Sequence, residues 1–174
     1  MQIENIKDAT PKEIRQIQLR ELEILKSLNE VLDKHDLPFF VIGGTLIGAI
    51  RDKGFVAWDD DIDLMMMRED FETFYAHPEW LEGTNFMLQR SNAKVNQHLT
   101  GMTFKDKTTT FINKHSVRES ITHSMFIDIM PLDYRPVGKF KRNLQIFYAM
   151  LFSLYNADRM PDHQGKLLRT LSWL

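Results

Sequence analysis

The chain has 174 residues, of which 43% are hydrophobic and 26% charged, so it suits one folded domain with a sizeable core rather than a disordered chain. Its formal net charge is −2, which gives no basic field for a nucleic-acid partner. The absence of cysteine excludes a disulfide framework, a cysteine nucleophile and thiolate metal ligands. No apolar stretch has the form of a signal peptide or the length of a membrane span, so we expect a cytoplasmic protein.

The first predicted element is an amphipathic helix from Pro11 to about His35. Thr10 is a suitable N-cap, and Glu13 three residues later is typical of a capping box. A short buried strand is expected at 39–42. The Gly43-Gly44 turn then breaks this strand, and Thr45 is expected to cap a short helix that runs through Arg51.

The rest of the chain alternates between further strands and helices. The pattern predicts a helix at 68–77, strands at 62–67, 86–90, 100–105, 108–112 and 125–130, and a last amphipathic helix at 140–155. Pro131 is expected to end the last strand. This order favours an α+β fold, with helices packed on one mixed sheet. The apolar end at 167–174 carries no helix stop signal, which indicates a truncated chain.

Asp61 and Asp63 are the first candidates for a metal site. Alternate residues of a strand point to the same face, so these two carboxylates share one face while Ile62 and Leu64 share the other. A divalent cation is the usual partner of paired carboxylates, and oxygen ligands favour Mg²⁺ or Mn²⁺. A solvated acidic turn is the alternative. An EF-hand loop is excluded because Leu64 stands where that loop needs glycine.

Two other features point to the same chemistry. Gly43-Gly44-Thr45 lies between a strand and a helix, where free backbone N–H groups bind phosphate, although such turns also carry glycine for packing. Asp128 lies within an apolar run and is hard to explain as surface decoration, although a solvated sheet face remains open. A neighbouring strand that carries Asp128 toward Asp61 and Asp63 would complete a three-carboxylate site.

The segment from Gly44 to Asp63 closely resembles the signature of the LicD family, bacterial phosphocholine transferases and their relatives, which include fukutin-like glycan phosphotransferases. The segment 126–133 resembles the second block of that family, and the similarity runs from about Glu21 to Tyr134. Asp52 and Ser124-Met125 depart from the usual pattern. The resemblance implies a nucleotidyltransferase-like catalytic core at 1–135, followed by a helical segment at 136–174.

The resemblance also implies an activity: metal-dependent transfer of a phospho-alcohol, typically phosphocholine from CDP-choline, to a sugar hydroxyl of a cell-surface glycan or lipid-linked glycan precursor. The positions that match the metal ligands and catalytic carboxylates are Asp61, Asp63 and Asp128. The positions that match contacts to the donor phosphates are Gly44, Thr45, Arg51 and Lys105. Asp128 is also the candidate to accept the hydroxyl proton.

Two other functions remain open at this point. The first is a glycosyltransferase that uses its Asp-x-Asp pair and a nucleotide sugar, and the second is a non-catalytic binding module. The basic residues Lys139, Lys141 and Arg142 precede an aromatic helix, a pattern typical of peripheral membrane contact. Packing of this helix against the sheet is the alternative.

Overall fold

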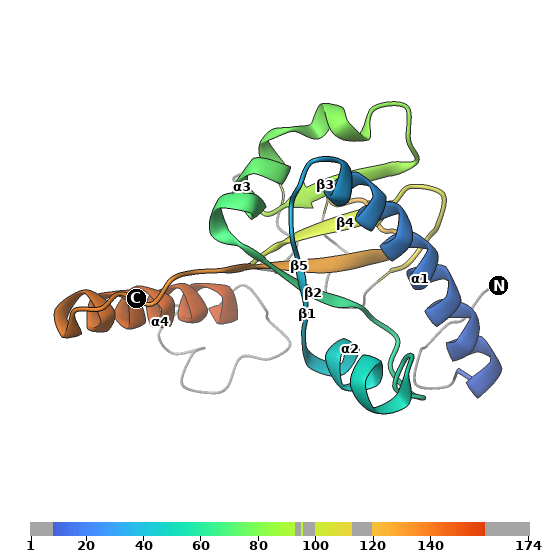
Figure 1. Cartoon of the computed structure of the whole chain (residues 1–174), viewed down its shortest axis with the longest axis horizontal. Helices are drawn as coiled ribbons and strands as arrows, with labels where there is room; N and C mark the ends of the chain where they lie inside the picture. The colour runs from blue at the N-terminus through green and yellow to red at the C-terminus, as the bar shows by residue number, and fades with distance from the viewer. Residues whose placement is uncertain (1–8, 93–94, 96–99, 113–119, 159–174) are drawn as a thin grey trace.

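A computed structural model describes residues 9–92, 95, 100–112 and 120–158 (Figure 1). They form a five-stranded mixed sheet with strand order β1-β2-β5-β4-β3, flanked by helices, which confirms the predicted α+β class. The strands are β1 (Phe40–Val41), β2 (Asp63–Met67), β3 (Phe86–Arg90), β4 (Met102–Asp106) and β5 (Phe126–Leu132). The helices are α1 (Pro11–Lys34), α2 (Gly43–Ile47), the π-helix η2 (Gly48–Asp52), α3 (Arg68–Ala76), the 3₁₀ helix η3 (Pro78–Leu81) and α4 (Lys139–Asp158).

Helix α1 begins as the sequence predicts. The Thr10 hydroxyl accepts a hydrogen bond from the Glu13 backbone N–H, and the Glu13 carboxylate accepts one from the Thr10 backbone N–H at 2.8 Å. This reciprocal pair satisfies two of the donors that a helix start leaves free. Figure 1 shows α1 lying across one face of the sheet.

The hydrophobic core fills the space between that face and helices α1 and α3. The strands contribute alternate residues, and the helices contribute residues at helical spacing. The fully buried members with the largest side chains are Phe71, Phe74, Phe104, Ile24, Leu28, Leu32, Ile62, Leu64, Met66, Met102, Ile127 and Ile129. Because these positions point into the core, their strand neighbours Asp63, Lys105 and Asp128 point to the opposite face of the sheet.

Strand β5 joins the two halves of the sheet. It pairs in parallel with β2, placing Asp63 opposite Asp128, and in antiparallel with β4, placing Thr103 opposite Asp128. The predicted end of this strand at Pro131 was wrong, since Pro131 pairs with Met66. Pairing between β4 and β5 ends at Ile129, so Pro131 has β2 beside it but not β4. Proline is therefore tolerated here, because its missing N–H costs no hydrogen bond to β4.

The strand predicted at 108–112 was also wrong. The Asp106 carboxylate accepts hydrogen bonds from the backbone N–H of Thr108 at 2.9 Å and from its hydroxyl at 2.7 Å. The Thr109 backbone N–H donates to the Asp106 carbonyl. These bonds fold the chain into a turn directly after β4, and a side chain that bonds its own backbone in this way competes with a strand ladder.

Helix α4 lies to one side of the sheet (Figure 1). Its large apolar side chains are exposed, so the core-packing alternative for this helix is wrong within the described residues. The exposed members are Phe140, Leu144, Ile146, Phe147, Tyr148, Met150, Leu151 and Phe152. No helix in the described ranges is both long and apolar enough to span a bilayer. The apolar segment 167–174 lies outside the described residues, and the division at 135/136 stays a prediction.

Candidate active site

The centre of the candidate site is the parallel pair of strands β2 and β5. Their register sets Asp63 directly beside Asp128 on the same face of the sheet. A backbone hydrogen bond supports this register, since the Asp128 N–H donates to the Ile62 carbonyl at 3.2 Å. On the other side of β2, the Ile42 N–H donates to the Asp63 carbonyl at 3.2 Å. Strand β5 thus carries Asp128 to Asp63, which lies 65 residues earlier in the chain.

The glycine turn packs against the aspartates. Gly43 has a φ of +56°, a left-handed conformation that favours glycine, and a Cβ there would lie 3.4 Å from Asp63 Oδ2. A Cβ on Gly44 would lie only 2.2 Å from Asp59 Oδ2. The missing side chain at Gly44 thus leaves the space that the Asp59 carboxylate occupies.

Thr45 does not cap the short helix as predicted. The helix begins at Gly43 with Ile42 as its N-cap, and Thr45 lies in the first turn, so the predicted N-cap role was wrong. Its hydroxyl accepts a hydrogen bond from the Asp63 backbone N–H at 3.0 Å. Thr45 therefore ties the start of α2 to the first residue of β2, and through it to Asp63.

The loop before β2 adds more negative charge. We call the carboxylates of Asp59, Asp60, Asp61, Asp63 and Asp128 the acidic site. Asp59 is half-buried, and its Oδ2 is enclosed without a hydrogen-bond partner. Burial, followed by the charges of Asp60 and Asp63, raises the Asp59 pKa. Asp61 reaches the surface, yet desolvation and then the charge of Asp63 raise its pKa to about 6.

Asp128 also has a raised pKa. Burial and then the charges of Asp63 and Asp61 raise its pKa to about 7, with Lys105 acting in the opposite direction. Within the described residues, no basic side chain forms an ion pair with the acidic site. Carboxylates that share a site without such a partner need a proton or a cation.

Lys105 lies near enough to Asp128 for its charge to act on that carboxylate. It is buried, its Nζ donates to the Thr122 carbonyl at 2.5 Å, and it lies 5.6 Å from the centre of the Phe126 ring. Burial lowers the Lys105 pKa to about 8, while the charge of Asp128 acts to raise it. Lys105 is thus a cation that the fold holds beside an anion.

Arg51 is placed differently from Lys105. It lies exposed in the last turn of η2, and its guanidinium donates to the neighbouring Asp52 carboxylate through two hydrogen bonds of 2.9 and 2.8 Å. A phosphate would have to compete with Asp52 for this fork. The phosphate-binding roles of Arg51 and Lys105 stay predictions.

Sequence analysis missed Gln18 and Glu21. Both are buried on α1, and Gln18 Nε2 donates to the carbonyls of Val56 at 3.0 Å and Asp59 at 2.9 Å. Burial, followed by the charge of Asp61, raises the Glu21 pKa to about 9. The available signal was periodicity, because Gln18 and Glu21 lie on the same helical stripe as Ile14, Ile17 and Ile24.

The donor set fits a hard divalent cation. The acidic site offers carboxylate oxygens only, and Asp59 Oδ2 has no hydrogen-bond partner that a cation would have to displace. No three Asp, Glu or His side chains among the described residues converge closely enough to enclose a metal ion by themselves. Mg²⁺ commonly keeps several waters and takes one or two protein carboxylates, so the residues present suit Mg²⁺ or Mn²⁺.

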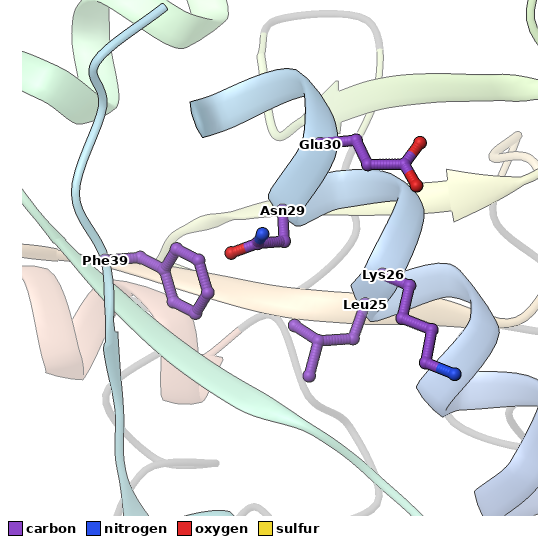
Figure 2. Close-up of a pocket in the computed structure, with 5 residues that line it drawn as sticks. All are labelled: Leu25, Lys26, Asn29, Glu30 and Phe39. Atoms are coloured by element: carbon purple, nitrogen blue, oxygen red, sulfur yellow. The ribbon is translucent and has the colours of Figure 1, made fainter. Parts of the chain in front are cut away.

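Two surface depressions of the described structure lie away from the acidic site. Figure 2 shows one between α1 and the segment leading into β1, lined by Leu25, Lys26, Asn29, Glu30 and Phe39. A second is lined by residues of η3, β3 and the turn between them, together with Lys107. Neither includes a residue of the acidic site.

The fold and the site together define the class: an α+β chain in which two neighbouring strands present carboxylates beside a glycine turn. A family model described as the LicD/FKTN/FKRP nucleotidyltransferase domain matches residues 36–161, so this chain belongs to that family. The match contains the glycine turn, Asp61, Asp63 and Asp128, and it extends into α4. Family membership confirms the resemblance drawn from the sequence.

Curated relatives match over shorter segments. The lipopolysaccharide cholinephosphotransferase LicD of Haemophilus influenzae is 44% identical over 61 residues, which are 35% of this chain and 23% of the relative. An uncharacterized protein of Caenorhabditis elegans is 39% identical over 71 residues, 41% of this chain and 17% of its own length. One of Rickettsia prowazekii is 38% identical over 48 residues, 28% and 18% of the two chains. The matched segments thus span less than a quarter of each relative.

Proposed function

We propose that the chain carries out metal-dependent transfer of a phospho-alcohol, with phosphocholine from CDP-choline as the first candidate, to a sugar hydroxyl of a cell-surface glycan precursor. The observation that carries this proposal is the placement of Asp63 beside Asp128, next to the glycine turn that opens α2. Family membership and the 44% identity to a lipopolysaccharide cholinephosphotransferase support the choice of donor and acceptor.

In this proposal the carboxylates of Asp61, Asp63 and Asp128 share Mg²⁺ or Mn²⁺ with water and the donor phosphates, since no three described acidic side chains enclose a metal ion by themselves. The bound cation would offset the negative charge of the donor pyrophosphate. Asp63 is held for this task from two sides, because its backbone N–H is fixed by Thr45 and its carbonyl by Ile42. A ligand whose backbone is fixed in this way needs little reorganisation when it binds.

The donor phosphates are assigned to the start of α2. Helical bonding begins with the Leu46 N–H donating to the Ile42 carbonyl, so the preceding amides at Gly44 and Thr45 are those that a helix start leaves available. Lys105 supplies a positive charge beside Asp128. Arg51 adds a second positive charge if its guanidinium releases the Asp52 carboxylate and binds a phosphate oxygen instead.

The transfer step needs a proton acceptor. The acceptor oxygen forms a bond to the phosphorus that bears the alcohol, the bond from that phosphorus to the bridging oxygen breaks, and CMP leaves. Asp128 takes the hydroxyl proton. A strong base is not needed for this, because a bound cation would make the hydroxyl more acidic.

Product analysis tests the proposed function. The chain is incubated with Mn²⁺, a panel of CDP-alcohols and UDP-sugars, and a glycan acceptor, and the products are identified by mass spectrometry. We expect a phosphodiester-linked alcohol on the acceptor and stoichiometric CMP. A transferred sugar would identify a glycosyltransferase instead, and the absence of any product, together with no donor binding by calorimetry, would leave a non-catalytic module.

We also propose that α4 contacts the cytoplasmic surface of an anionic membrane, where a lipid-linked acceptor is met. The helix exposes its apolar side chains, and residues 134–157 contain no Asp or Glu. The cations of this stretch are Arg135, Lys139, Lys141 and Arg142. Exposed apolar area beside cations fits a surface of anionic lipid, to which each cation adds about 1 kcal/mol of attraction.

A further inference from the structure

The open face of the sheet, which lies opposite the core, changes from acidic to apolar within one strand repeat. Asp63 and Asp128 lie side by side on this face. The next residues of β2 and β5 on the same face, Met65 and Met130, also lie side by side. On the other side of Met65 is Phe40 of the edge strand β1. We call the side chains of Phe40, Met65 and Met130 the Phe–Met row.

The Phe–Met row does not belong to the hydrophobic core. Met65 and Met130 are half-buried, whereas their strand neighbours Leu64 and Ile129 are fully buried on the other face of the sheet. Phe40 is 50% exposed. None of the three packs into the core cluster. The fold thus leaves an aromatic ring and two thioethers accessible directly beside the candidate carboxylates.

The surroundings of the Phe–Met row are negatively charged. The acidic site borders it, and no basic side chain among the described residues forms an ion pair with that site. Lys105 lies on the far side of Asp128, because it pairs with Phe126, two residues earlier on β5. Its Nζ lies 5.6 Å from the centre of the Phe126 ring. An apolar surface bordered by anions favours a ligand group that is both apolar and cationic.

We propose that the Phe–Met row binds the quaternary ammonium group of a choline donor. A trimethylammonium group carries a positive charge but has no N–H, so it is recognised by aromatic faces rather than by hydrogen bonds. Thioethers are polarizable and adapt their shape to such a group. This inference rests on the proposed function, in which the acidic site takes the donor pyrophosphate, and it names the residues that select the transferred alcohol.

The spacing along the strands fits this ligand. Residues two apart on one strand are separated by roughly 7 Å. In phosphocholine a two-carbon bridge joins the phosphate oxygen to the nitrogen, so the cation lies only a few ångströms from the phosphorus. A phosphorus held near Asp63 and Asp128 therefore leaves the ammonium within reach of Met65 and Met130. Phe40 supplies the aromatic face, and no cation of the described residues lies against its ring.

The test is donor affinity, measured by calorimetry with Mn²⁺ present. Each protein is titrated with CDP-choline, with CMP, and with CDP-3,3-dimethylbutanol, in which carbon replaces the ammonium nitrogen and removes the charge but keeps the shape. Phe40→Leu removes the aromatic face, and Met65→Gln replaces a thioether by a polar amide. Met87→Gln is the matched control, since Met87 is also half-buried on the open face but lies on β3, roughly 14 Å from β2.

We expect wild type to bind CDP-choline about three- to tenfold more tightly than the neutral analogue, the range from a partly exposed to a desolvated contact between a cation and a ring. Phe40→Leu should lose most of this preference, and Met65→Gln should weaken CDP-choline binding severalfold. Affinity for CMP should stay unchanged in both variants, because CMP carries no alcohol to place on the row. Met87→Gln should match wild type for all three nucleotides.

The outcomes separate this inference from the proposed function. Equal affinity of wild type for CDP-choline and the neutral analogue overturns the inference, since the row then recognises apolar shape alone. Wild-type affinity for CDP-choline in both Phe40→Leu and Met65→Gln also overturns it, and phosphocholine transfer by wild type would leave the proposed function standing. If wild type binds none of the three nucleotides, the proposed function fails as well.

A variant that also loses CMP affinity has suffered general damage to the site, and Phe40→Tyr then decides. Tyrosine keeps the aromatic face at this position. A preference for CDP-choline over the neutral analogue that is retained in Phe40→Tyr and lost in Phe40→Leu supports the inference, and its loss in both overturns it.

Discussion

Replacing Gly44 with alanine should damage the site through one contact. The added Cβ would lie 2.2 Å from Asp59 Oδ2, where ordinary contact begins at 3.4 Å, so the Asp59 carboxylate must withdraw by roughly 1 Å. That oxygen is enclosed, which limits where it can go. Overpacking of this kind typically costs about 1–3 kcal/mol of unfolding free energy. Gly44 does not have a positive φ, so backbone strain adds nothing to this cost.

The assay is equilibrium unfolding in urea, arranged as a double-mutant cycle with Asp59→Ala. With the carboxylate removed, Gly44→Ala should cost nothing, or even stabilise by a few tenths of a kcal/mol because alanine favours a helix. Gly54→Ala is the matched control, since a Cβ there meets no atom within 4 Å. A cost of Gly44→Ala that is the same with and without Asp59 would refute the contact as its cause.

Four further outcomes follow from the described contacts. Asp63→Asn should abolish transfer and leave the fold intact by circular dichroism; wild-type turnover would remove the metal-site proposal. Thr45→Ala should lower the unfolding free energy by about 1 kcal/mol in urea and Thr45→Ser should not, because serine keeps the acceptor for the Asp63 N–H. Burial acts to raise the Asp106 pKa, but hydrogen bonds from Thr108 and Arg20 outweigh burial and lower that pKa in the folded protein. The ionised Asp106 side chain therefore stabilises the fold above about pH 4, the pKa of an unfolded aspartate. This stabilisation is lost as the pH falls through the lower pKa of the folded state. The unfolding free energy lost in Asp106→Asn should therefore be large at pH 7 and small at pH 2.5, and an equal loss at both would contradict the lowered pKa. The chain should sediment with anionic liposomes at low salt and less at high salt, and neutralising the basic residues at the start of α4 should abolish this; wild type that stays in the supernatant at low salt would remove the membrane contact.

The elements that the sequence predicted well were those with local signals. The Thr10–Glu13 capping box lies within four residues, and the buried Ile62, Leu64 and Met66 separate the faces of β2 by simple alternation. Asp63 could therefore be placed on the open face without knowledge of the sheet. That Asp63 lies beside Asp128 could be predicted only from the strand order. No local pattern in β2 or β5 shows which strand it pairs with.

The errors came where a side chain or the environment decides the structure. Residues 108–112 have a strand-like composition, but the Asp106 carboxylate captures the Thr108 backbone and turns the chain. Periodicity describes α4 correctly as a helix and says nothing about what covers its apolar residues. Glu21 was passed over because a charge on a helix is usually solvated, and only the packing of α1 shows this one to be buried.

The strand order has a consequence for how the protein folds during synthesis. Among the described strands β5 is the last to be synthesised, yet it is the middle strand of the sheet. Until it emerges, β2 and β4 lack their shared neighbour and leave edges that can pair with other chains. Long-range pairing of this kind forms slowly, because a long loop must first close. Insertion of β5 between β2 and β4 protects these edges from aggregation. The same insertion brings Asp128 beside Asp63.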